Sequence, residues 1–326
     1  MDEKVVLVTG IGGNVGQGIL RNILNSPYPI KLIGTNTEAF SAGNFFCNIT
    51  YKVPFATNPY YIKEINKIVK TEKVDLIIPS TDYEVYALAM NTNKIKCKVA
   101  VSGMQSAEMY LDKYKTYLLH KKFGIPFAES VLPSKFKNQF KNYIAKPREG
   151  RGSRGLISNP KSTKQFKDTE YMIQEMHLGI ELTTAFYVTK KRKLLGFITL
   201  ERSLENGTTI LCKVNDKYNK KVEEIIKKMI KHTDMTGSVN LQFIVDKNEN
   251  IHPFEVNCRV SGTNSIRSNF GFKDVEYILE ENLFNKVPNR PKIVHGTAIR
   301  VLMDIIYPEQ EVKEIIKKKS KRSFIF

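Results

Sequence analysis

The sequence predicts an α/β domain built on a parallel sheet, followed by a mixed α+β region. Up to about residue 107, short apolar runs rich in β-branched residues alternate with segments of helical periodicity. Beyond that point, strand-like runs in pairs are combined with single amphipathic helices. Strands that alternate with helices form a parallel sheet whose two faces are both covered. The 326 residues are enough for roughly two or three domains with a sizeable core.

The first domain begins with a strand and a glycine-rich turn. The run "KVVLVTG" at residues 4–10 is the first strand, and "IGGNVGQGILRNIL" leads from a turn into a helix. The remaining elements expected in this domain are strands at 30–36, 74–80 and 97–103 and helices at 59–73 and 82–91.

The second region mixes antiparallel strands with helices. Its hairpin is indicated by the turn "DKNEN" between two apolar runs. The elements expected here are a helix at 106–124, strand-like runs at 125–132 and 142–159, antiparallel strands at 171–204, a helix at 219–235 and the hairpin at 238–262.

The composition narrows the possible partners. The net charge of +18 is compatible with nucleic acid, a membrane or anionic small molecules. Lysines are spread over helix-like segments and are not interleaved with aromatics, so we favour a solvated lysine-rich surface over specific nucleic-acid binding. No apolar run approaches the ~18–20 residues that span a bilayer, and no signal-peptide pattern opens the chain.

The cysteines indicate a cytoplasmic protein with reduced thiols, because they are scattered without metal-ligand spacing: Cys47, Cys97, Cys212 and Cys258. The basic C-terminal tail, residues 306–326, is interpreted as a solvated helix end or frayed tail, with an anionic partner as the alternative.

The glycine loop after the first strand has two interpretations. Gly10, Gly12, Gly13 and Gly16 lie between a strand and a helix, where backbone N–H groups can approach a phosphate. A dinucleotide site also needs an acid at the end of the second strand, and Asn36 stands there. A tight structural turn is therefore at least an equal explanation. A dinucleotide-dependent oxidoreductase remains the alternative function.

A second glycine-rich loop, "KPREGRGSRG", starts at Lys146. Glycines let the backbone fold over phosphates, and the arginines and the lysine oppose phosphate charge. The loop is not a Walker A motif, which needs GxxxxGK[ST]. A surface hairpin loop is the alternative, but the lysine directly before the loop favours phosphate binding.

The stretch "FEVNCRVSG" places three polar side chains at alternate positions. In a strand, Glu255, Asn257 and Arg259 would share one face. In the predicted hairpin, Gln242 would lie opposite Glu255. The oxygens of Gln242, Glu255 and Asn257 suit Mg²⁺, which shares its ligands with phosphates. A half-exposed strand with a surface ion pair is the alternative.

Together these motifs resemble the ATP-grasp superfamily, and most of all its carbamoyl-phosphate-synthase-like members. The stretch "EVNCRVSG" is similar to that family's E-x-N-x-R-x-S motif. The resemblance implies a Rossmann-like pre-ATP-grasp domain at 1–107, followed by a two-lobed ATP-grasp fold. The implied first lobe is 108–175, and the second lobe with the metal site is 176–305.

The resemblance also implies roles for individual residues. Lys113 and Lys146 would meet phosphate, the glycine loop would close over the phosphates, and Glu181 would hold the ribose. Arg259 and Lys146 would be the catalytic residues. The implied ATP-binding residues are Lys113, Lys146, Gly150, Gly152, Ser153, Gly155, Glu175, Met176, His177, Glu181, Gln242 and Glu255. The implied metal ligands are Gln242, Glu255 and Asn257, and the candidate substrate residues are Arg267, Asp82 and Glu84.

The implied reaction is carboxylate–amine ligation with ATP and Mg²⁺, for which Mn²⁺ can substitute. A carboxylate would attack the γ-phosphate, and an amine or similar nucleophile would displace phosphate from the acyl phosphate. Gly262 stands where the family's bicarbonate pattern has an arginine, which disfavours bicarbonate. Phosphorylation of bicarbonate or carbamate and nucleotide binding without turnover remain alternatives. By analogy with the superfamily, a homodimer is expected.

Overall fold

The computed structural model describes residues 2–150, 152, 154–317 and 324–325, which fold into two compact units. The first unit comprises Met1–Ser102, Arg259–Lys292 and Arg300–Phe326, and the second comprises Gly103–Cys258 and Ile293–Ile299. The sequence analysis placed boundaries at residues 107, 175 and 305, where the family resemblance implies the ends of lobes. These boundaries are defined differently from the two compact units, and they stay predictions.

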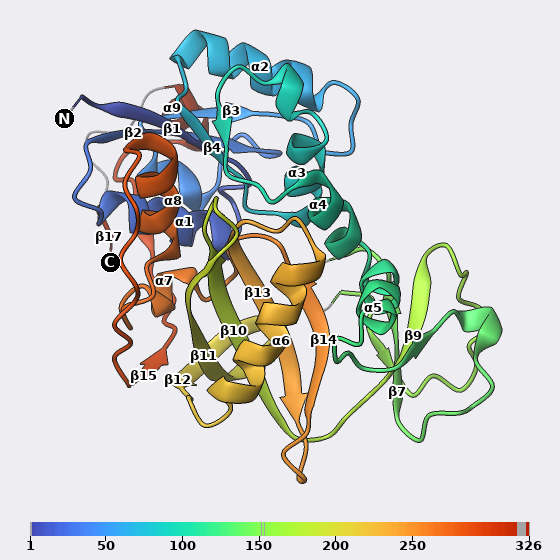
Figure 1. Cartoon of the computed structure of the whole chain (residues 1–326). Helices are drawn as coiled ribbons and strands as arrows, with labels where there is room; N and C mark the ends of the chain where they lie inside the picture. The colour runs from blue at the N-terminus through green and yellow to red at the C-terminus, as the bar shows by residue number, and fades with distance from the viewer. Residues whose placement is uncertain (1, 151, 153, 318–323, 326) are drawn as a thin grey trace. The chain divides into compact units, whose positions relative to one another are not determined.

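The first unit contains the predicted parallel sheet, with helices packed on it (Figure 1). The strands are ordered β3-β2-β1-β4-β5, and every neighbouring pair is parallel. The strands are β1 (Lys4–Val8), β2 (Ile30–Asn36), β3 (Ile49–Lys52), β4 (Leu76–Ile78) and β5 (Lys98–Val99). The helices among them are α1 (Asn14–Leu24), α2 (Tyr61–Glu72) and α3 (Asp82–Ala89), with 3₁₀ turns η1 (Ala42–Phe46) and η2 (Thr92–Lys94).

The edge strand β3 escaped the sequence analysis. It has four residues, "ITYK", and none of them is buried, so it lacks the apolar run that marked the other strands. The strand expected at 97–103 shrinks to the two residues of β5. The later segments of the unit add α7 (Asn264–Arg267), α8 (Asp274–Leu283), α9 (Val312–Lys317) and the short pair β16 (Ile305–Ile306) and β17 (Phe324–Ile325).

The second unit contains two antiparallel sheets. A four-stranded sheet has the order β6-β9-β7-β8, and a six-stranded sheet has the order β14-β13-β10-β11-β12-β15. Their strands are β6 (Ser130–Val131), β7 (Tyr143–Pro147), β8 (Ile157–Ser158), β9 (Tyr171–Glu175), β10 (Ile180–Val188), β11 (Leu194–Glu205), β12 (Thr208–Val214), β13 (Gly237–Val245), β14 (Ile251–Asn257) and β15 (Thr297–Ile299). The helical segments are α4 (Met104–Leu111), α5 (Lys113–Lys122), η3 (Pro133–Lys135) and α6 (Asn219–His232).

The single helix expected at 106–124 is wrong, because the chain breaks it at Asp112. This residue has an extended backbone (φ −99°, ψ 114°) and is the N-cap of α5. Its carboxylate accepts hydrogen bonds from the backbone N–H groups of Tyr114 (2.8 Å) and Lys115 (3.2 Å). It also pairs with Arg148, which ties the start of α5 to the strand β7 and its following loop. A side-chain cap of this kind stabilises a helix start by ~1 kcal/mol.

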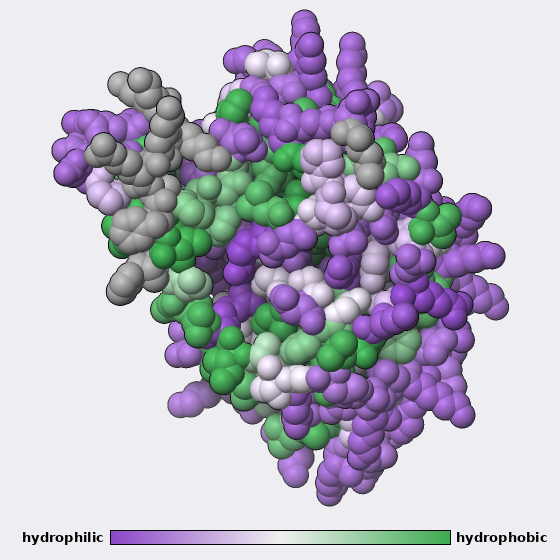
Figure 2. Space-filling view, turned by 90° about the vertical axis from the view of Figure 1, so that its left-hand side faces the viewer, coloured by the Kyte–Doolittle hydropathy of each residue, from purple (hydrophilic) through white to green (hydrophobic). Residues whose placement is uncertain are grey.

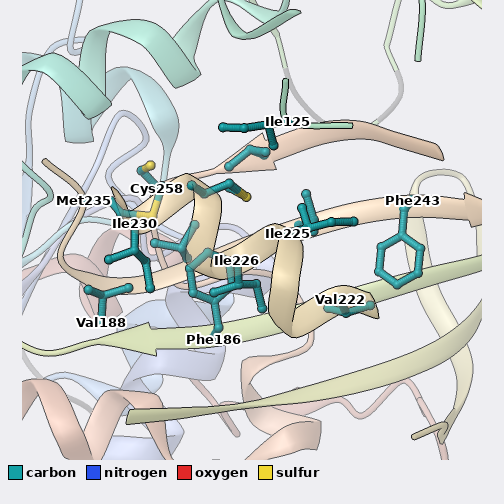
Figure 3. Close-up of a cluster of buried hydrophobic side chains, with 14 of the residues drawn as sticks. Ile125, Phe186, Val188, Val222, Ile225, Ile226, Ile230, Met235, Phe243 and Cys258 are labelled. Atoms are coloured by element: carbon teal, nitrogen blue, oxygen red, sulfur yellow. The ribbon is translucent and has the colours of Figure 1, made fainter. Parts of the chain in front are cut away.

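One face of the six-stranded sheet is apolar and packs against α6 (Figure 1). Alternate residues of β13, Val239, Leu241, Phe243 and Val245, belong to this core. Figure 3 shows side chains from α6, such as Ile226, lying among side chains of β10 and β13. The other residues of these strands point to the opposite face, so strand alternation separates a core face from a polar face.

The surface in Figure 2 is largely hydrophilic, with apolar patches among the polar side chains. Within the described part of the chain, no helix combines the length and the apolar character needed to cross a membrane.

Candidate functional site

A cavity of ~320 Å³ lies within the second unit and is lined by residues of both of its sheets. Ten of the twelve residues predicted to bind ATP line it: Lys113, Lys146, Gly150, Gly152, Glu175, Met176, His177, Glu181, Gln242 and Glu255. Gly155 does not line the cavity, and Ser153 lies outside the described residues. The structure thus brings together side chains that are more than a hundred positions apart in the sequence.

The polar face of the six-stranded sheet forms one wall. Gln242 in β13 lies directly opposite Glu255 in β14, which confirms the predicted hairpin register. A bulge follows between Gln242 and Phe243. Because neighbours of Gln242 on β13 point into the core, Gln242 itself must face the cavity.

Lys146 is the most constrained cation of the site. Its side chain is nearly fully buried, and its Nζ donates to Oε1 of Gln174 (2.7 Å) and to the backbone oxygen of Phe254 (2.9 Å). Burial lowers its pKa to about 7; Glu255 raises the pKa and Lys113 lowers it further. A lysine with such a pKa gains its full charge readily when an anion approaches.

Several described residues of the loop that follows Lys146 line the cavity, among them Gly150, Gly152 and Arg154. Lys113 donates from Nζ to the backbone oxygen of Gly150 (3.2 Å), and Arg154 also lines the cavity. Gly152 and Gly155 have φ values of +63° and +73°, which residues other than glycine rarely adopt. The backbone conformation therefore explains why these two positions are glycines, and the basic residues make the loop positively charged.

The segment from Glu175 to His177, where β9 ends, also lines the cavity. The backbone N–H groups of Glu175 and Met176 donate to the oxygens of Glu129 and Asn142. The imidazole of His177 stacks on that of His252, with ring centroids 3.6 Å apart and planes at 12°. Burial, followed by the neighbouring His252, lowers the pKa of His177, which favours the neutral form of the stacked ring. Flat rings and apolar lining residues such as Ile244 and Leu204 suit a planar base.

Arg202 is a cavity residue that the sequence analysis missed. It lies on β11 and donates to Oε1 of Glu181 from Nε (3.0 Å) and from its terminal NH2 (2.5 Å). It also donates to Oε1 of Gln242. The strands β10 and β11 are antiparallel, and Leu182 lies opposite Glu201. The next position beyond this pair therefore brings Arg202 of β11 close to Glu181 of β10. The alternation in "LERSL" shows that Arg202 shares a strand face with Leu200 and Leu204. It could have indicated a cavity residue only if the partner strand had been known.

The predicted metal ligands lie together. Nε2 of Gln242 donates to Oδ1 of Asn257 (3.1 Å), and Nδ2 of Asn257 donates to Oε1 of Glu255 (3.2 Å). Among the described residues, no group of three or more His, Cys, Asp or Glu side chains could hold a metal. A divalent cation here would depend on one carboxylate, two amide oxygens and oxygens from a ligand, which fits Mg²⁺ bound with a phosphate.

Arg259 differs from its sequence interpretation. The strand β14 ends at Asn257, so Arg259 is not the third member of an alternating face. It belongs to the first unit, where its guanidinium pairs with Asp82 (2.7 Å). Asp82 is thereby a partner of Arg259 in the same unit.

Glu84 and Arg267 have internal partners as well. Glu84 is buried and forms the capping box of α3 with Thr81. Arg267 has no exposed surface, and its guanidinium pairs with Asp274. Neither side chain lines the described cavity. A substrate role for Glu84 or Arg267 is therefore not part of our proposal.

The glycine loop after β1 has a steric explanation. A Cβ on Gly10 would lie 2.3 Å from Oγ of Ser80, and Gly10 has a φ of +62°. A Cβ on Gly16 would lie 2.5 Å from the backbone oxygen of Gly10. These contacts support the tight-turn interpretation.

Family comparisons agree with this architecture. Residues 6–101 match the family described as PylC-like, N-terminal domain, and residues 110–263 match the ATP-grasp domain family. The chain therefore carries an ATP-grasp domain preceded by a PylC-like N-terminal domain. This confirms the predicted superfamily and fold, and the class of activity that the domain defines is that of ATP-dependent ligases. The narrower likeness to carbamoyl-phosphate synthases stays a prediction.

Solved structures show the same fold at low identity. The ADP complex of N5-carboxyaminoimidazole synthetase from Staphylococcus aureus has a TM-score of 0.75 and 14% identity, covering 92% of this chain and 82% of that one. A biotin carboxylase complex from Campylobacter jejuni has a TM-score of 0.70 and 15% identity, with 90% and 74% coverage.

A third structure contains magnesium and nucleotide. The biotin carboxylase domain of the Hydrogenobacter thermophilus 2-oxoglutarate carboxylase, in complex with MgADP, ADP and bicarbonate, has a TM-score of 0.71 and 13% identity, with 90% and 73% coverage. No curated protein matches the chain significantly.

Proposed function

We propose that this protein is an ATP- and Mg²⁺-dependent ligase of the carboxylate–amine type, which activates a carboxylate as an acyl phosphate. The observation that carries the proposal is the single cavity that unites ten predicted ATP-binding residues. Its cations suit a polyphosphate, and its stacked histidines suit a planar base.

The phosphates would lie at the cationic end. Lys113, Lys146 and Arg154 line the cavity there, together with the backbone of Gly150 and Gly152. Positioned cations in a site with little water stabilise the charge of a transferring phosphoryl group and need no reorganisation during the reaction. Lys146 is the residue we assign to this role, since two acceptors and burial hold its Nζ in place.

The base and ribose would lie toward the opposite end. The segment Glu175–His177 would contact adenine through backbone oxygens and the ring of His177, because two of its N–H groups are already used. Glu181 lines the same cavity and would accept hydrogen bonds from ribose hydroxyls. For this to happen, Glu181 would share or exchange its present partner Arg202.

Gln242, Glu255 and Asn257 would hold Mg²⁺. When bound, the ion supplies neutralisation of phosphate charge and a fixed geometry for the nucleotide. The residues themselves contribute one negative charge and two amide oxygens, so phosphate oxygens would complete the coordination. Arg259 follows these ligands closely in sequence, and we retain it as the candidate that contacts the transferring phosphoryl group.

The acceptor is a small carboxylate, and the second nucleophile is an amine or a similar group. Gly262 disfavours bicarbonate, since a glycine and not a second arginine directly follows the "EVNCRVS" motif. We place the reaction in the cytoplasm, which the four free cysteines support.

The test is release of ADP and phosphate from ATP in the presence of Mg²⁺, across a panel of amino acids, small carboxylates and bicarbonate. One carboxylate should stimulate release, and Glu255→Ala should reduce it by ~100-fold or more because it removes the only carboxylate of the metal set. Glu223→Ala is the matched control, since Glu223 is a partly exposed acid on α6 outside the cavity. Unchanged turnover in Glu255→Ala would sink the site assignment. ATP that stays bound but unhydrolysed with every acceptor would favour the alternative of a binding protein.

A further inference from the structure

Three side chains of the cavity, those of Arg202, Gln242 and Glu255, form with Asn257 a hydrogen-bond chain that runs in one direction. It starts at the guanidinium of Arg202, which donates to Oε1 of Gln242. Gln242 donates from Nε2 to Oδ1 of Asn257, and Asn257 donates from Nδ2 to Oε1 of Glu255. The chain thus begins at a cation and ends at a carboxylate, crossing the strands β11, β13 and β14.

Each amide in this chain presents its oxygen to a protein donor. Those oxygens, and Oε1 of Glu255, are the atoms with which the proposed metal ligands would bind Mg²⁺. The cation at the head of the chain cannot lose its charge, because a guanidinium stays protonated in proteins. Arg202 therefore occupies, with a permanent positive charge, the neighbourhood that a divalent cation would need.

The charges nearby offer a metal little compensation. Of the three proposed ligands only Glu255 is charged, and Glu181, another carboxylate of the cavity, already pairs with Arg202. The side chain of Arg202 is 12% exposed and that of Glu181 is 29% exposed, so water screens this pair only in part. The guanidinium of Arg202 has Glu181 as its counter-ion, but it is the guanidinium and not the carboxylate that contacts Oε1 of Gln242. A bare divalent cation would therefore meet a positive charge at this ligand, whereas a nucleotide brings several negative charges of its own.

We propose that Arg202 guards the metal subsite as an internal cation, so that Mg²⁺ enters only together with the phosphates of a nucleotide. This inference deepens the proposed function and rests on it. Phosphate oxygens offer Arg202 a new partner with bidentate geometry, and its departure from Gln242 frees Oε1 for the metal. Arg202 is a positioning residue in this scheme: it orients both amides before the nucleotide arrives and makes metal binding conditional.

The rival explanation is that Arg202 is merely the counter-ion of Glu181. In that case its contact with Gln242 would have no consequence for the metal. The two explanations differ in what happens when the guanidinium is removed, because only a guarding cation suppresses metal binding.

The experiment is titration of the full chain with Mn²⁺ in the absence of nucleotide, followed by electron paramagnetic resonance of the free ion. We expect the wild-type chain to bind Mn²⁺ weakly and Arg202→Gln to bind it at least ~10-fold more tightly, since a like charge has been removed beside the ligands. Arg202→Lys keeps the charge and should stay close to wild type. Lys213→Gln is the control: Lys213 is an exposed cation on the adjacent strand β12, outside the cavity.

Second substitutions locate the metal that Arg202→Gln binds. Adding Glu255→Gln should abolish the gained binding, whereas adding Glu181→Gln should leave it. Equal Mn²⁺ affinity of the wild-type chain and Arg202→Gln would overturn the inference. Binding that depends on Glu181 instead of Glu255 would also overturn it.

A parallel titration with a non-hydrolysable ATP analogue separates this inference from the proposed function. If the wild-type chain binds no nucleotide with or without Mn²⁺, the proposed function fails. If nucleotide binds and Mn²⁺ binds just as tightly without it, the proposed function stands and only the guarding role of Arg202 is refuted.

Discussion

Nucleotide binding should be coupled to uptake of a proton by Lys146. In the structure the side chain of this lysine is 4% exposed, and burial lowers its pKa from 10.5 to about 7. Phosphates placed beside Nζ favour the charged form and move the pKa back toward its ordinary value. The nucleotide-free lysine is thus largely neutral in mildly alkaline solution and charged in the complex.

The size of the effect follows from these two pKa values. With a pKa of about 7 in the free protein, binding takes up ~0.9 proton at about pH 8 and ~0.1 proton at about pH 6. The nucleotide affinity should then fall by ~50-fold, or ~2.3 kcal/mol, between about pH 7 and pH 9. Binding raises the pKa of Lys146, so the complex holds a proton that the free protein loses as the pH rises above about 7. The nucleotide affinity therefore falls as the pH rises between the pKa of the free protein and that of the complex.

Isothermal titration calorimetry measures this uptake directly. The apparent binding enthalpy is plotted against the ionisation enthalpies of several buffers, and the slope gives the number of protons. Lys146→Met removes the titrating group, and Lys146→Arg keeps a charge that does not titrate in this range. Protons exchanged by the nucleotide itself are common to all three proteins and cancel in the comparison. Equal slopes for wild type and both variants at about pH 8 would refute the reasoning.

Three further predictions concern stability, each measured by calorimetric or denaturant unfolding. Burial lowers the pKa of His120 from 6.5 to about 4, so the unfolded chain binds this proton more tightly than the folded chain. As the pH falls from about 6.5 to 4, ~3 kcal/mol of stability should therefore be lost. His120→Phe should remove that part of the pH dependence, and an unchanged pH profile would contradict the prediction. Arg267→Met should cost ~3–5 kcal/mol because it removes the guanidinium that pairs with the buried carboxylate of Asp274, and the double replacement Arg267→Met/Asp274→Leu should recover part of the loss; a double variant as unstable as the single one would argue against this. Gly18→Ala should cost ~1–3 kcal/mol, since its Cβ would lie 2.4 Å from Oδ1 of Asn264; wild-type stability would mean that Asn264 moves freely.

Periodicity predicted the elements whose burial pattern is regular. The hairpin of β13 and β14 is the clearest case: alternation and the "DKNEN" turn predicted that Gln242 faces Glu255, and the register is as expected. The break at Asp112 was not predicted, because the helical pattern continues across it. There, a side-chain cap and the partner Arg148 override local periodicity.

The motifs in the sequence predicted most of the residues that line the cavity, but they did not predict which acid pairs with which arginine. Arg202, Arg259 and Arg267 have the same chemistry and similar surroundings in the sequence. The structure puts Arg202 in the cavity, pairs Arg259 with Asp82 and buries Arg267 against Asp274. The sequence by itself determined the strand–helix alternation of the first unit, the glycine turns and the class of protein, because these depend on local conformation and on motifs along the chain. Only the tertiary structure decided which carboxylate neutralises which arginine, because that depends on distances between strands and helices that are remote in sequence.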